Sequence, residues 1–138
     1  MLKTLLLFST VILLSACGGV ATYKYAPMRE GFFNTTGYDA VQVDSNTYRV
    51  IFYGLRNTSV EIADRYSFYR AAELTLEKGF DYYVVLQTGD DDKNGDAWNI
   101  VRMFKGTPPE SDLATFDARE VVKDMAPFID RGAEGANK

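Results

Sequence analysis

The stretch from residue 59 to residue 78 constrains the fold most, because its helical pattern is apolar on two sides. Thr58 and Glu61 have the spacing of a capping box at its start, and Gly79 is placed to end it. One stripe consists mainly of small residues suited to packing on a sheet: Val60, Ala63, Ser67, Ala71 and Leu74. A bulkier stripe lies nearly opposite: Ile62, Tyr66, Tyr69 and Leu76. A surface helix ordinarily buries one stripe, so this helix must either be covered on two sides or offer one side to a partner.

Strand-like segments come in pairs before and after this helix. Residues 38–43 and 48–54 alternate in polarity around the turn sequence DSNT, which predicts a hairpin. Residues 80–87 and 97–105 predict a second pair, and Asp117 begins a second helix that Pro127 ends. The order β-β-α-β-β-α predicts an α+β fold with one roughly four-stranded sheet and both helices on one face. We expect the second helix to cover the bulky stripe.

Residues 1–16 have the pattern of a cleaved signal peptide, with Lys3 before an apolar run over residues 5–14. Ten helical residues span about 15 Å, roughly half of a bilayer's hydrocarbon core, so a spanning anchor is not expected. Cys17 is the only cysteine, and the sequence LSAC that it completes resembles the bacterial lipobox.

That resemblance implies cleavage after Ala16, a diacylglycerol on the Cys17 sulfur and an acyl chain on the new amino group. Two or three acyl chains hold a protein firmly at a membrane. Since Gly18 follows instead of an aspartate, comparison with Gram-negative lipoproteins implies the outer membrane. We expect the domain to face the periplasm, with exposure at the cell exterior as the alternative.

The remaining chain is expected to contain one domain. Residues 17–37 resemble a lipidated tether, although four aromatic residues in it indicate that part of the tether docks on the domain. Residues 38–130 form the predicted α+β domain, and residues 131–138 form a polar tail predicted to be disordered.

Composition excludes several classes of function. The chain has no histidine, which removes Ser-His-Asp and Cys-His catalysis and the usual catalytic zinc sites. Its net charge is −4 and it has no basic cluster, so nucleic acid is not an expected partner. We expect a protein that is not an enzyme.

Two groups of charged residues are candidate sites. Arg70 and Glu73 lie between the two stripes of the helix, where they would either contact a partner or form a structural ion pair helped by Glu77. The ion pair is the favoured interpretation. An exposed aromatic platform around Trp98 would instead indicate a cell-wall glycan as ligand.

The second group matches the first half of a calcium loop: Asp90, Asp92, Asn94 and Asp96. The twelfth position of such a loop requires a bidentate glutamate, and here it is Val101. A hairpin connection with Asn94 and Gly95 in the turn is therefore favoured over a calcium site. No cofactor is expected apart from the covalent lipid on Cys17.

Two segments also resemble a known family: GYDAVQVDSNTYRVIFYG and RYSFYRAAELTLEKGFDYYVV. They are similar to an uncharacterised family of small proteobacterial lipoproteins, over about residues 37–86. The resemblance implies a lipoprotein and brings no activity with it. We therefore expect a membrane-anchored lipoprotein that serves as a binding or envelope-assembly module and contacts an envelope protein. A ligand-binding lipoprotein, for calcium or cell-wall glycan, is the alternative.

Overall fold

The structure is a computed structural model that describes residues 24–32 and 34–131. The predicted signal peptide, the lipidation site at Cys17 and residues 132–138 lie outside the described residues. Within the described part, no helix combines the length and the apolar character needed to cross a membrane.

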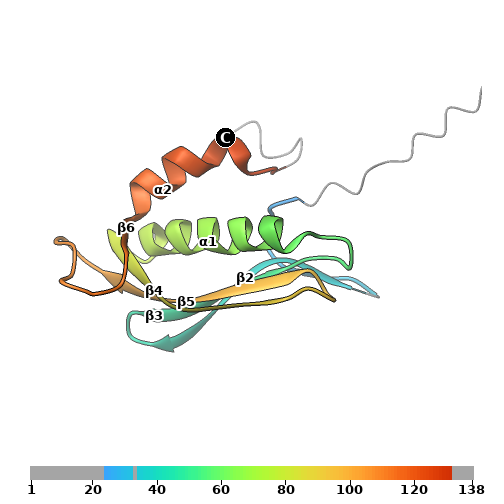
Figure 1. Ribbon diagram of the computed structural model, residues 1–138, viewed down its shortest axis with the longest axis horizontal. Helices are drawn as coiled ribbons and strands as arrows, with labels where there is room; N and C mark the ends of the chain where they lie inside the picture. Colours follow the sequence, from blue (N-terminus) through green and yellow to red (C-terminus); the bar gives the residue numbers. More distant parts are fainter. Residues whose placement is uncertain (1–23, 33, 132–138) are drawn as a thin grey trace, which may run out of the picture.

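The described residues form an α+β domain, as predicted. Its elements are β1 (Arg29–Glu30), β2 (Thr35–Asp44), β3 (Thr47–Tyr53), α1 (Val60–Glu77), β4 (Tyr82–Asp91), β5 (Asp96–Phe104), β6 (Thr115–Asp117), α2 (Ala118–Met125) and a 3₁₀ helix (Ala126–Phe128). The strands make one sheet in the order β1-β2-β3-β5-β4-β6, and each of these strands is antiparallel to its neighbours. Both helices lie on one face of this sheet (Figure 1).

Three layers follow from the two-sided helix: the sheet, then α1, then α2 (Figure 1). The small stripe faces the sheet, where Ala63, Ser67 and Ala71 are fully buried. Ser67 Oγ accepts a hydrogen bond of 2.7 Å from Asn99 Nδ2 on β5, which satisfies two polar groups at this interface. The prediction that small residues pack on the sheet is therefore confirmed.

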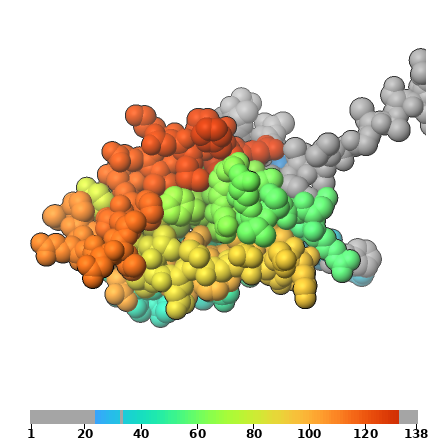
Figure 2. All heavy atoms as spheres, in the orientation of Figure 1, coloured from blue at the N-terminus to red at the C-terminus, as the bar shows by residue number. Residues whose placement is uncertain are grey.

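The bulky stripe is covered by both ends of the described chain. Tyr66 and Tyr69 are buried in a cluster with Tyr25 and with Ile129 from the C-terminal end. Tyr25 belongs to residues 24–28, the segment before β1 that is here called the N-terminal arm. Val122 and Met125 of α2 pack against the same cluster, so α2 covers this stripe only in part. In the space-filling view, α2 lies as a layer over α1 (Figure 2).

The prediction of a four-stranded sheet was wrong, because β1 and β6 extend it on both sides to six strands. These strands contain two and three residues, too few to show a polarity period in the sequence. Two long strands also exceed their predicted limits: β2 begins at Thr35, and β4 continues to Asp91.

Both predicted domain limits need correction. Tyr25 is only 2% exposed, which confirms that part of the expected tether docks on the domain and shows that the folded part begins well before residue 38. Arg131 lies in the expected disordered tail yet forms an ion pair with Glu73. The folded part therefore includes this residue.

The start of α2 and the end of α1 agree with the sequence patterns. Asp117 caps α2 by accepting hydrogen bonds from the backbone N–H groups of Arg119 and Glu120. Gly79 has φ of +81°, as a residue following a helix often does. The start of α1 is one residue later than predicted, because Thr58 Oγ1 accepts from Leu55 N–H instead and Ser59 caps the helix.

Candidate functional site

Glu73 is the centre of a charged cluster that ties three segments together. Tyr25 OH from the N-terminal arm donates to Glu73 Oε2, and the Arg131 guanidinium from the C-terminal end donates to Oε1. Arg70 Nη1 is 3.4 Å from Oε2. Tyr25 N–H also donates to the carbonyl of Asp130, so the two ends of the described chain meet on α1.

Tyr25 is a structural donor in this cluster. Burial, followed by the negative charge of Glu73, raises the pKa of Tyr25 above its ordinary value, so its hydroxyl keeps its proton. Its ring also contacts the rings of Tyr38, Tyr66 and Tyr69 at centroid distances of 4.6, 5.5 and 5.2 Å. The arm is therefore held both by aromatic packing and by a charge-assisted hydrogen bond.

Arg70 pairs more closely with Glu77 than with Glu73. Its two terminal nitrogens donate to the two Glu77 oxygens at 2.6 and 2.7 Å, the parallel arrangement that guanidinium and carboxylate favour. Burial is the largest effect on the pKa of Arg70 and lowers it, but the hydrogen bonds that Arg70 donates to Glu77 and the electrostatic effects of its neighbours, Tyr25 and Glu77 among them, together raise that pKa. The guanidinium also lies 4.5 Å from the centre of the Tyr38 ring. The structure thus brings Arg70 and Glu73 together, with Glu77 as the stronger partner.

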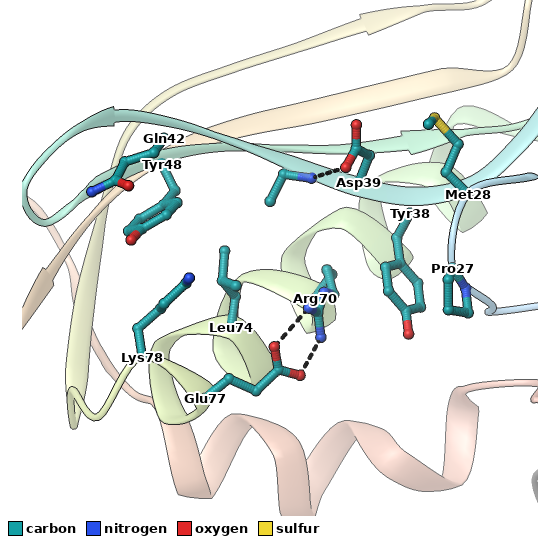
Figure 3. A pocket seen from close by; sticks show the side chains of 11 residues that line it. Pro27, Met28, Tyr38, Asp39, Gln42, Tyr48, Arg70, Leu74, Glu77 and Lys78 are labelled. Atoms are coloured by element: carbon teal, nitrogen blue, oxygen red, sulfur yellow. Dashed lines mark hydrogen bonds and ion pairs between the residues drawn. The ribbon is translucent and has the colours of Figure 1, made fainter.

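An open groove, here called the α1–β2 groove, lies beside this ion pair and has a volume of about 700 Å³. Its lining residues are Pro27, Met28, Tyr38, Asp39, Ala40, Gln42, Tyr48, Arg70, Leu74, Glu77 and Lys78. Side chains of α1 face those of β2 and β3 across it (Figure 3). Lys78 Nζ lies 5.5 Å from the centre of the Tyr48 ring. The groove therefore combines aromatic surface with both signs of charge, as binding sites commonly do.

The groove exists because α1 does not cover the whole sheet. The helix packs mainly over β5, β3 and β4, and β2 lies beyond it at the edge formed with β1. Alternation along β2 then directs Tyr38, Ala40 and Gln42 toward the uncovered space.

The candidate calcium segment, residues 90–96, lies away from the α1–β2 groove, in the β4–β5 hairpin. Asp90 is paired with Ala97 within the sheet, and the turn is closed by Asn94 N–H and Gly95 N–H donating to the carbonyl of Asp91. Asp96 Oδ1 accepts from Gly54 N–H at 3.0 Å. Residues 24–32 and 34–131 include no group of three or more Cys, His, Asp or Glu arranged to hold a metal ion.

Trp98 lies apart from the groove. Its ring packs on Gly89, where an added Cβ would be 2.3 Å from the indole, and the Arg49 guanidinium lies 4.7 Å from the ring centre. The ring is half-buried by these contacts, so the side chain offers less free surface than the sequence indicated.

Sequence reasoning missed Tyr25, Tyr38 and Arg131 as parts of the cluster. Tyr25 and Glu73 are 48 positions apart, so no local spacing relates them. The one available signal was the unusual aromatic content of the expected tether.

Comparison of the chain with protein-family models, with curated proteins and with solved structures gives no match. The similarity to proteobacterial lipoproteins stays a prediction from the residues quoted above.

Proposed function

We propose that this chain is a lipid-anchored binding module of the bacterial outer membrane, which faces the periplasm and holds an envelope partner in the α1–β2 groove. The single observation that carries the binding role is the groove itself. It is open and of mixed aromatic and charged character, and it lies between packed elements that hold its shape. The lipobox-like sequence ending at Cys17 supports the membrane anchor.

The charges around the groove favour binding over catalysis. Arg70 is held by Glu77 through two hydrogen bonds, and both oxygens of Glu73 accept from Tyr25 or Arg131. Carboxylates that are already engaged by cations and donors are poorly placed to exchange protons with a substrate. Of these groups, Arg70 and Glu77 line the groove and give its wall a fixed geometry and fixed charges.

The tether supports a role close to the membrane. Seven residues separate Cys17 from the buried Tyr25, so an extended tether reaches about 28 Å. Pro27 and Met28 line the groove only a few residues later. A lipid on Cys17 would therefore keep the groove near the bilayer surface, where an envelope partner would be met.

Site-specific photo-cross-linking in living cells tests this proposal. A photoreactive amino acid at Gln42, an exposed groove residue, should give light-dependent adducts of defined mass. The same amino acid at Asp92, exposed in the β4–β5 turn, is the matched control and should give none. Equal labelling from both positions, or none from Gln42, would contradict the assignment of the groove.

A further inference from the structure

The strand β2 has a free outer edge from Asp39 to Asp44, here called the free β2 edge. On this side β1 pairs only with Thr35 and Thr36, and the arm reaches only to Tyr38. In the described residues no strand continues this pairing beyond Tyr38. An unpaired edge of this length is a template for another strand.

The hydrogen bonds of Tyr38 show which backbone N–H and C=O groups of β2 point away from β3. Its N–H donates to Ala26 O and its carbonyl accepts from Met28 N–H, each at 2.8 Å, so both groups point outward. Alternation along an antiparallel strand places the same groups of Ala40 and Gln42 on that edge. Asp39 Oδ1 accepts from Ala40 N–H at 2.8 Å and so occupies one of these groups.

The free β2 edge borders the α1–β2 groove. Ala40 and Gln42 both line the groove, so every second side chain of a strand added beside them would face it. On the opposite face of the sheet, Val41 and Val43 are 54% and 58% exposed. An added strand would therefore gain backbone hydrogen bonds, a groove for one set of side chains and apolar contacts for the other.

We propose that the free β2 edge binds an extended segment of a partner protein as an additional strand, one with basic residues at its ends and β-branched apolar residues between them. This inference rests on the proposed function and names the kind of partner that the groove takes. The charge of the free β2 edge determines which charge is expected on the partner strand. Asp39 and Asp44 lie at its two ends, so a basic strand is attracted to it.

A second copy of the chain is disfavoured as the occupant. Antiparallel pairing of two β2 edges would bring Asp39 of one copy near Asp44 of the other, and like charges across strands are destabilising. The chain as a whole is also acidic, with a net charge of −4.

Peptide binding to the full chain, purified in detergent micelles, tests the inference. The probes are three capped heptapeptides: one of alternating Val and Thr with Lys at both ends, one with Glu at both ends, and the Lys form with alternate amides N-methylated. Two favourable charge pairs predict that the Lys form binds about tenfold more tightly than the Glu form. N-methylation should abolish binding, because it removes the donors that an added strand needs.

Two variants and a control locate the site. Ala40→Pro should abolish binding, and its fold should persist because the Ala40 N–H points away from β3. Asp39→Asn with Asp44→Asn should preserve binding but reduce the preference for the Lys peptide to less than about threefold. Asp91→Asn with Asp92→Asn, which changes the same charge in the β4–β5 hairpin, should leave the tenfold preference intact.

Equal binding of the Lys and Glu peptides, or undiminished binding of the N-methylated form, would overturn the inference. Concentration-dependent dimerisation that Ala40→Pro abolishes would assign the edge to a second copy and overturn it as well. The two proposals can fail separately. If none of the peptides binds the parent chain while the adducts from Gln42 persist in Ala40→Pro, the groove keeps its binding role and the added strand is wrong.

Discussion

Tyr25 should contribute more to stability than any other residue of the N-terminal arm. Its side chain is 2% exposed, it touches three tyrosine rings, and its hydroxyl donates to Glu73. Two changes separate these contributions. Tyr25→Phe removes only the hydroxyl, and Tyr25→Ala removes the ring as well.

The magnitudes follow from these contacts. A hydrogen bond to a charged group contributes about 1.5–3 kcal/mol, and Glu73 keeps Arg131 as a partner, so Tyr25→Phe should cost about 1.5 kcal/mol. Removing a buried aromatic ring costs about 3–5 kcal/mol, so Tyr25→Ala should cost about 4 kcal/mol in all.

Urea unfolding of the chain measures the free energy of unfolding for each variant. Tyr82→Phe, at a half-buried tyrosine on β4, is the control and should lie within about 0.5 kcal/mol of the parent chain. Amide exchange at Met28 and Tyr38 should accelerate in Tyr25→Ala, because the arm that pairs with β2 is released. A loss below about 1 kcal/mol for Tyr25→Ala would refute the view that this residue fastens the arm.

Two further predictions concern acidic residues. Burial, with a smaller effect from Asp90, raises the pKa of Asp64, so its ionised form destabilises the folded state once the pH exceeds the ordinary carboxyl pKa. Because solvent screens this exposed carboxylate, Asp64→Asn should raise the melting temperature at pH 7 only slightly and have no effect near pH 3, and a decrease at pH 7 would contradict this. In the β4–β5 hairpin, millimolar calcium should leave the melting temperature unchanged, and Asp90→Asn with Asp92→Asn should be neutral or slightly stabilising. Stoichiometric calcium binding by calorimetry, lost in that double variant, would show instead that the segment is a calcium site.

The sequence predicted what depends on periodicity within one element. The two stripes of α1 indicated a cover on two sides or a partner on one, and in the structure the sheet covers one stripe while Tyr25 and the C-terminal segment cover the other. Asp117 and Gly79 marked helix ends because capping depends on side chains and backbone angles within a few residues.

The sequence could not predict what depends on distant partners. Tyr25 and Arg131 belong to opposite ends of the described chain, and only the folded α1 brings both to Glu73. The short strands β1 and β6 form by pairing with longer neighbours, not by a pattern of their own. The groove has the same origin, since it depends on how far α1 extends across the sheet.

Lipid attachment at Cys17 tests the proposal of a membrane-anchored module most directly. Cells that express the full chain are grown with an alkyne analogue of palmitate, and the label on the protein is measured after gel separation. The parent chain should carry the label and fractionate with the outer membrane, and Cys17→Ser should carry none. Label that persists in Cys17→Ser, or a parent chain that is never labelled, would contradict the lipid anchor.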